Sequence, residues 1–234
     1  LERFGLSLTL AIPLALIVGV GGGVINGLLT SRTGVNGFIV TLATGSAFAG
    51  INHGLTQSRP FHGIPKAFVA LGDSRWGFIP ALMWPPLAVA PLLGLFLYRL
   101  KAGRWLLAVG GNPSAAQLSG ISTNAVVTLA HAISGGLSGL AAILAVAQLG
   151  AAQPETGAGW LLVSFAGPII GGASLAGGSV SITGTFLAVL VIALIENVLV
   201  LTNVDPYWVQ FMLGALLMLT VAINRWRAIR AARG

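Results

Sequence analysis

Long apolar segments recur along this chain, and each contains at most one charged residue. They are residues 6–29, 37–51, 81–98, 125–149, 182–201 and 208–223. About 20 apolar residues in a helix cross a bilayer, so most of these segments can each form a membrane span. Only 7% of the residues are charged, whereas soluble domains usually carry about 25%. The pattern predicts an all-α, polytopic membrane helix bundle that forms one domain over residues 1–234.

A polar interruption, residues 100–123, separates the third and fourth of these segments. Basic residues open it (Arg99, Lys101 and Arg104), and a Gly-Gly-Asn-Pro turn is expected at residues 110–113. Pro113 suits the first position of a short helix that ends at Ser119-Gly120. The segment is therefore either a docking helix held between two spans or an ordinary loop that turns the chain.

A second break follows Trp160. Residues 160–170 are apolar but too short to cross a bilayer alone, and they run into a glycine-rich stretch, residues 171–178, before the next long apolar segment. We expect a re-entrant or broken element here. Irregular backbone at membrane depth is tolerated only where protein buries it or water lines it, which makes this element a candidate part of a translocation path.

Charge asymmetry predicts the orientation in the membrane. Eight basic residues lie on one side of the predicted spans: Arg32, Arg99, Lys101, Arg104, Arg225, Arg227, Arg230 and Arg233. Four lie on the other: Arg3, Arg59, Lys66 and Arg75. By the positive-inside rule, the interruption and the C-terminus are cytoplasmic, and the long segment 52–80 faces outward.

Several function classes do not fit. The chain has no cysteine. It also has no P-loop, and therefore it cannot bind ATP through that motif. Its net charge of +7 comes from residues that flank apolar spans, so we read it as setting topology rather than binding nucleic acid. The motif Gly136-Leu137-Ser138-Gly139 resembles that of rhomboid intramembrane proteases, but His131 lies seven positions earlier on the same predicted helix, about 10 Å away along its axis. We read Ser138 as a packing residue.

Two intramembrane polar residues stand out. Glu196 is the one acidic residue within an apolar segment, and Asn197 follows it. Ionisable groups inside a membrane are functional candidates by default. Lining of a pathway and structural pairing both remain open for this pair.

Five short motifs carry a resemblance to a known family. They are residues 110–121, Phe38-Ile39-Val40-Thr41-Leu42, residues 152–159, residues 171–178 and Gly184-Thr185. In this order and spacing they resemble the permease subunits of ribose-type ABC importers, which belong to the branched-chain amino acid/ribose permease superfamily. The chain departs from that family in lacking an N-terminal segment of the form Gly-Ile-Asp-Leu-Ser-Val-Gly, so we expect it to lack the first spans.

The resemblance implies a permease that imports a small solute, a sugar by expectation, across the bacterial inner membrane by alternating access. It implies no cofactor in this chain, since separate ATPase subunits bind ATP. Its partners would be those ATPases, a second permease copy or paralogue, an outer solute-binding protein and membrane lipid. The implied ATPase-coupling residues are Gly111, Asn112, Pro113, Ala115, Ala116, Leu118, Gly120 and Ile121.

From their placement, we add a candidate substrate pathway. Its residues are Phe38, Thr41, Phe165, Gly171, Gly172, Ser174, Glu196 and Asn197. The alternative to an ATP-driven importer is an ATP-independent channel or secondary carrier, for which the interruption at residues 100–123 would be dispensable.

Overall fold

Within the part of the chain that the structure describes, five helical segments are long and apolar enough to cross a membrane. They are α1 (Leu8–Thr33), α2 (Gly37–Thr56), the short 3-10 helix η1 (Ala81–Met83) together with α4 (Trp84–Arg99), α7 (Thr123–Leu149) and α9 (Ile182–Leu201). The computed structural model describes residues 7–174 and 177–203, and beyond them only residues 208, 211, 212, 214, 215, 218 and 222. The predicted all-α, polytopic membrane fold is confirmed. Most of the predicted last span and all of the C-terminal tail lie outside the described residues.

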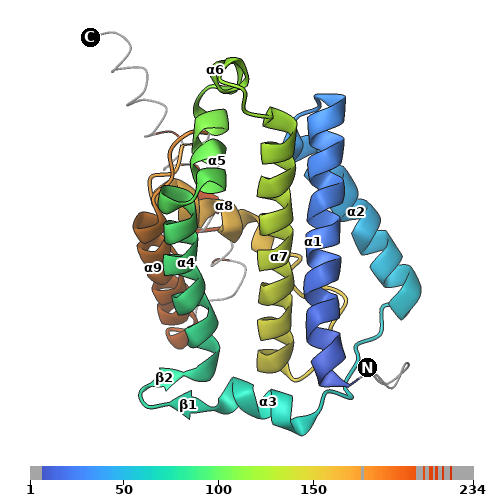
Figure 1. Cartoon of the computed structure of the whole chain (residues 1–234). Coiled ribbons are helices and arrows are strands. Elements are labelled where there is room, and N and C mark those ends of the chain that lie inside the picture. Colours follow the sequence, from blue (N-terminus) through green and yellow to red (C-terminus); the bar gives the residue numbers. More distant parts are fainter. Residues whose placement is uncertain are drawn as a thin grey trace.

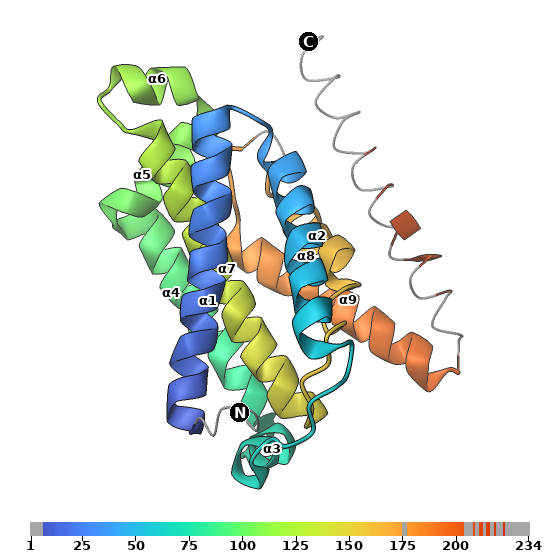
Figure 2. The same ribbon diagram turned by 90° about the vertical axis from the view of Figure 1, so that its right-hand side faces the viewer.

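Shorter elements complete the described fold. They are α3 (Lys66–Asp73), β1 (Arg75–Trp76), β2 (Ile79–Pro80), α5 (Lys101–Gly111), α6 (Pro113–Leu118) and α8 (Trp160–Ile170). Figures 1 and 2 show a bundle in which α6 lies at one end and α3 at the other. In Figure 2, α1, α4, α5 and α7 form one layer, and α2, α8 and α9 lie to its right. We call the two extremities the α6 end and the α3 end.

The antiparallel pair of α1 and α7 forms the centre of the bundle (Figure 1). Three glycines at four-residue spacing on α1, Gly19, Gly23 and Gly27, face the backbone of α7. A Cβ atom at Gly27 would lie 2.5 Å from the Cα atom of Thr128, and Gly135 on α7 faces Gly19 in the same way. Small residues at this spacing let two membrane helices approach until their backbones touch. We call this contact the α1–α7 seam.

The polar interruption contains a helix that was not predicted from the sequence. Residues 101–111 form helix α5, which follows α4 after a single extended residue, Leu100 (φ −87°, ψ 146°). Gly103 packs on the backbone of α4 at Phe96 and Leu97. The predicted Gly-Gly-Asn-Pro turn is wrong in its extent, because Gly110 and Gly111 are helical and the chain turns at Asn112. The physical reason is a sequence pattern: Gly103, Leu106, Leu107 and Gly110 recur at helical spacing and form one apolar face.

The α3 end is tied together by links between residues distant in sequence. Helix α2 extends five residues beyond the predicted end of its span and ends at Thr56. The backbones of Phe61 and Ala152 exchange two hydrogen bonds, of 3.0 and 2.9 Å. The Asn52 side chain donates to the carbonyl oxygen of Pro154 at 3.0 Å. The segment predicted as a long polar region therefore contains a helix and a small hairpin, held against the loop that follows α7.

Candidate functional site

Helix α6 is a six-residue helix that begins with a side-chain cap. Asn112 accepts a hydrogen bond from the Ala115 amide through its Oδ1 atom, at 3.0 Å. Pro113 occupies the first helical position, where its missing N–H costs nothing and its fixed φ suits the helix. The predicted short helix and the predicted role of Pro113 as its start are confirmed.

The other end of α6 closes in a Schellman motif. Gly120 adopts φ +79°, a left-handed conformation that favours glycine. The Gly120 amide donates to the Gln117 carbonyl, and the Ile121 amide donates to the Ala116 carbonyl, both at 3.0 Å. Ile121 also packs against the small apolar cluster to which Ala116 belongs. Both ends of α6 are therefore satisfied within the chain.

The two faces of α6 have opposite environments. Ala116 is buried, with 5% of its surface exposed, and it packs with Val109 of α5 and Val126 of α7. Leu118 is 91% exposed at the α6 end of the bundle. The predicted coupling residues thus form one continuous stretch, in which Ala116 and Ile121 fix the helix to the bundle and Leu118 points away from it.

Two of the predicted pathway residues meet between α2 and α8. The rings of Phe38 and Phe165 pack edge to face, with centroids 5.9 Å apart and planes at 63°. The Thr41 hydroxyl donates to the Phe38 carbonyl at 3.0 Å. Both rings retain considerable exposure, 50% for Phe38 and 39% for Phe165. This geometry places an aromatic pair on the layer of the bundle that contains α2, α8 and α9.

The chain turns between α8 and α9, and we call the described residues of this turn, 171–174 and 177–181, the reversal. A Cβ atom at Gly171 would lie 2.5 Å from the carbonyl carbon of Gly184, and Gly167 faces Val189 farther along. Because these pairs run in opposite chain directions, α8 and α9 are antiparallel at their crossing. Gly172 adopts φ +91°, and the Ser174 amide donates to the Ser179 carbonyl at 3.0 Å. The chain therefore reverses where the glycine-rich stretch predicted it.

Glu196 and Asn197 lie toward the other end of α9, five and four residues before its last residue, Leu201. Glu196 is partly buried and Asn197 is exposed. Neither side chain makes a hydrogen bond or ion pair within the described part of the chain. Structural pairing with a described residue is thus not observed, and their predicted place in a pathway stays a prediction.

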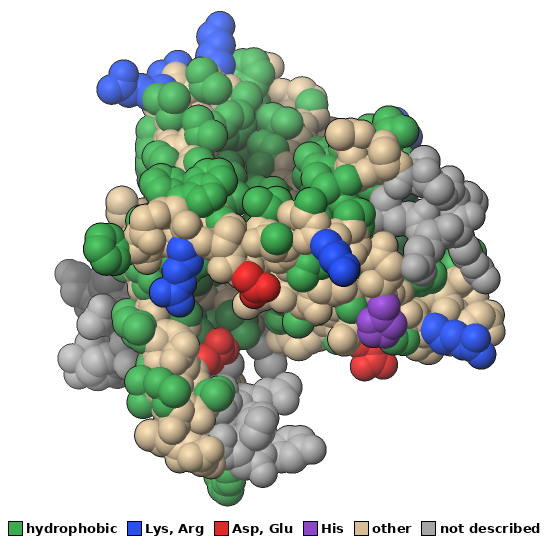
Figure 3. Space-filling view, turned by 90° about the horizontal axis from the view of Figure 1, so that it is seen from below, with side chains coloured by type: hydrophobic (Ala, Val, Ile, Leu, Met, Phe, Trp, Pro, Cys, Tyr) green, Lys and Arg blue, Asp and Glu red, His purple; other side chains and the backbone are tan. Residues whose placement is uncertain are grey.

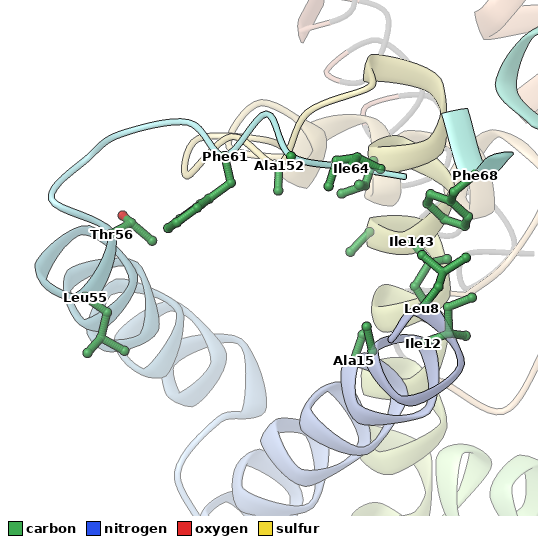
Figure 4. A pocket seen from close by; sticks show the side chains of 14 residues that line it. Leu8, Ile12, Ala15, Leu55, Thr56, Phe61, Ile64, Phe68, Ile143 and Ala152 are labelled. Carbon is green, nitrogen blue, oxygen red and sulfur yellow. The ribbon is translucent and has the colours of Figure 1, made fainter. Parts of the chain in front are cut away.

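Two apolar cavities were not predicted from the sequence. One, of about 470 Å³, lies at the α3 end between α1, α7 and the segment that follows α2. Figure 4 shows Leu8, Ile12 and Ala15 from α1 on one side of it, with Phe61 and Ile64 along its edge. The other, of about 620 Å³, lies between α4 and α9. A sugar site needs several convergent polar groups, and the linings of both cavities are too apolar to supply them.

Charged side chains spread over the α3 end, as Figure 3 shows from below. The exposed residues here include Arg59, Lys66, Asp73, Arg75 and Glu155. No group of three or more potential metal ligands exists among the residues that the structure describes. This face therefore offers a polar surface of mixed charge.

The serine of the protease-like motif has a structural environment. The Ser138 hydroxyl donates to the Ser134 carbonyl at 3.0 Å, one turn earlier on α7. His131 bonds through Nδ1 to the Val127 carbonyl at 3.0 Å, also within α7. The neighbouring Gly139 packs on α1 at Ala15 and Leu16. The interpretation of this motif as helix packing is confirmed, because neither side chain is positioned to act on the other.

The fold defines a multi-pass membrane helix bundle, with a short capped helix at one end and a reversal between two antiparallel helices. Comparison with known proteins identifies its family. The chain belongs to the family described as "Branched-chain amino acid transport system / permease component", which it matches over residues 1–221. That family is a transporter component, and the resemblance drawn from the five sequence motifs is confirmed.

Several similar proteins are named as sugar permeases. The chain is 33% identical over 222 residues to the ribose import permease protein RbsC of Haemophilus influenzae, covering 93% of this chain and 68% of the relative. It is 35% identical over 209 residues to the D-allose transport system permease protein AlsC of Escherichia coli, covering 89% of this chain and 64% of the relative. It is 29% identical to the L-arabinose transport system permease protein AraH of the same organism, and the match covers 87% of this chain and 62% of the relative. The chain thus spans about two thirds of the length of these relatives. No solved structure matches it.

Proposed function

We propose that this chain is the transmembrane subunit, or most of it, of an ATP-binding-cassette importer that moves a small sugar across the bacterial inner membrane. Separate ATPase subunits bind and hydrolyse ATP, and a solute-binding protein delivers the sugar on the outer side. Transport proceeds by alternating access, in which the ATPases drive the bundle between inward-open and outward-open states. The sugar permeases among its relatives support the substrate class.

The observation that carries the proposal is the presentation of α6. A helix of six residues is too short to be stable alone, yet this one is capped at both ends and fixed to α5 and α7 through Ala116. It holds Leu118 almost fully exposed beyond the bundle. A rigidly held apolar side chain of this kind suits insertion into a groove on a partner protein. We assign that groove to the ATPase.

The distribution of basic residues supports an orientation in which the α6 end faces the cytoplasm. Arg99, Lys101 and Arg104 lie at the junction of α4 and α5, on the way to α6. The positive-inside rule then assigns the α6 end to the cytoplasm, where the ATPases work, and the four arginines after residue 223 assign the C-terminus to the same side. The mixed-charge surface at the α3 end faces outward, where a solute-binding protein would dock.

The apolar character of both cavities supports a pathway that this chain does not form alone. We place the pathway along the layer of α2, α8 and α9, where Phe38 and Phe165 are exposed and where Glu196 and Asn197 have no described partner. A second permease copy or paralogue would cover this layer and complete the path.

Leu118→Glu tests the ATPase-docking role of α6. In the full-length permease, extracted in mild detergent, we expect recovery of the co-purifying ATPase to fall at least about tenfold, as expected for loss of a buried apolar anchor. The matched control is Gln117→Glu, which adds the same charge at a neighbouring exposed position. Ala116 is unsuitable, because it is buried in the bundle and its replacement would disturb the fold.

Two results would count against the proposal. If the parent permease recovers no ATPase, or if Leu118→Glu recovers as much as Gln117→Glu does, α6 is not the coupling element. Uptake that follows an ion gradient without ATP would then favour a secondary carrier.

A further inference from the structure

The last turn of α5 touches the reversal backbone to backbone. A Cβ atom at Gly110 would lie 2.7 Å from the amide nitrogen of Gly178. A Cβ atom at Gly178 would lie 2.6 Å from the Cα atom of Gly111, and one at Gly177 would lie 3.0 Å from the carbonyl carbon of Gly110. No side chain separates these two segments, which are more than 60 residues apart in sequence. We call this contact the glycine joint.

A hydrogen bond from α4 holds the same part of the chain. The Tyr98 hydroxyl, one residue before the end of α4, donates to the Val180 carbonyl at 2.6 Å. Val180 lies two residues beyond Gly178, so the reversal is attached to both α4 and α5 within a few residues. Figure 1 shows this orange segment beside α5, near the α6 end.

The glycine joint lies between two elements that the proposed function uses. On one side, α5 ends at Gly111, and the capping residue Asn112 alone separates it from α6. On the other side, the reversal leads into α8 and α9, which cross tightly at Gly171 and Gly184. A displacement of α6 would therefore reach the reversal through Asn112, the last two residues of α5 and one backbone contact.

Backbone contact matters because the two segments in contact cannot adjust to each other by changing side-chain rotamers. Long side chains can change rotamer and absorb a small movement, whereas close-packed backbones pass it on. Both Gly177 and Gly178 have positive φ, +94° and +81°, so the reversal approaches α5 in a conformation that other residues rarely adopt.

We propose that the glycine joint transmits the movement of α6 to the reversal, and so couples ATP hydrolysis to the movement of α8 and α9. Gly110 is then a positioning residue for transport, with Gly177 and Gly178 as its counterparts. This inference rests on the proposed function of α6 as the helix that docks on the ATPase.

The test compares Gly110→Ala with Gly94→Ala in the full-length permease, reconstituted with its ATPase and solute-binding protein. Gly94 lies within α4, and no atom lies within 4 Å of the position of a Cβ atom there, so Gly94→Ala is the matched control. We measure ATPase co-purification, basal ATP hydrolysis and sugar uptake per ATP hydrolysed.

The expected result is a permease that binds its ATPase but is poorly coupled. Gly110→Ala should keep ATPase recovery and basal hydrolysis while uptake per ATP falls about tenfold, within the range expected from overpacking a tight contact. Gly94→Ala should stay within about twofold of the parent, since it adds one methyl group in open space. Equal uptake per ATP in the two variants would overturn the proposal, as would loss of ATPase recovery in Gly110→Ala alone.

A second variant covers the case in which Gly110→Ala fails to fold. Tyr98→Phe removes the hydroxyl bond to Val180 and adds no volume, so it should lower uptake per ATP by several-fold. Unchanged coupling in Tyr98→Phe would then overturn the proposal. Failure of the proposed function looks different, because the parent permease itself would recover no ATPase.

Discussion

The α1–α7 seam and the glycine joint use the same residue for different purposes. In the seam, glycines on one helix face the backbone of another along three turns, and the two helices are both long and continuous. In the glycine joint, glycines meet at a single place, between the end of a short helix and an irregular segment. The two helices of the seam cannot slide past each other without breaking many packing contacts at once. The joint is a single contact, which we propose moves as one unit and transmits its movement to α8 and α9.

The largest effect on stability is expected from a substitution in the α1–α7 seam. Gly23→Ala places a methyl group against the backbone of α7 at His131 and Ala132. We expect the free energy of unfolding to fall by about 2–3 kcal/mol, the upper part of the range for overpacking, because backbone cannot rotate away. Denaturation of the purified permease in mixed detergent micelles measures it.

The matched control lies two residues earlier on the same helix. Gly21 has no atom within 4 Å of the position of a Cβ atom. Gly21→Ala should be neutral or stabilising by up to about 1 kcal/mol, since alanine is the better helix former. Similar losses in both variants would show that the seam does not depend on close approach at Gly23.

A smaller effect is expected where α8 crosses α9. This contact is intermediate between the α1–α7 seam and the glycine joint. Gly171→Ala would bring a Cβ atom to within 2.6 Å of the Cα atom of Thr185. We expect a loss of about 1–2 kcal/mol in the free energy of unfolding, because one end of a short helix can shift more easily than a long one. Hydrogen exchange should rise in α8 and the start of α9, and not in α1 or α7.

The control for this crossing is at the other end of α8. Gly159 has a right-handed conformation (φ −83°) and open space around it, so Gly159→Ala should leave exchange in α8 unchanged. Increased exchange across the whole bundle in Gly171→Ala would mean that the crossing stabilises the entire fold rather than its own layer.

The smallest effect concerns a polar link with no glycine in it. The Thr44 hydroxyl of α2 donates to Asn26 of α1. Thr44→Val should lower the free energy of unfolding by about 0.6 kcal/mol, the average for hydrogen bonds between membrane helices. Thr41→Val is the control, since the Thr41 hydroxyl bonds within α2 itself. A loss above about 2 kcal/mol in Thr44→Val would mean that polar contacts rival the seam.

How much of this could be predicted from the sequence depended on distance along the chain. The spans follow from runs of apolar residues, and α6 follows from Asn112, Pro113 and Gly120, whose capping effects act within a few residues. Helix α5 was missed because three basic residues near its start drew the interpretation toward a loop. The apolar spacing of Gly103, Leu106 and Gly110 was the signal that could have revealed it.

Contacts between segments that are distant along the chain could not be predicted from the sequence. The glycine-rich stretch predicted a reversal, but nothing in it indicated that Gly177 and Gly178 would lie against Gly110. The pairing of Phe38 with Phe165 had a basis only in their shared assignment to a pathway. The two apolar cavities had none, because their linings come from four separate parts of the chain in one case and two helices in the other.

The capping of α6 has a consequence for the thermodynamics of association. A segment that folds only on binding must lose about 1–2 kcal/mol of backbone entropy per residue at that moment. Because Asn112 and Gly120 already hold α6 in its helical form, that entropy is lost when the permease folds, not when it meets its partner. Complex formation through α6 should therefore show a small unfavourable entropy of ordering, and its heat capacity change should reflect the apolar surface around Leu118 rather than helix formation.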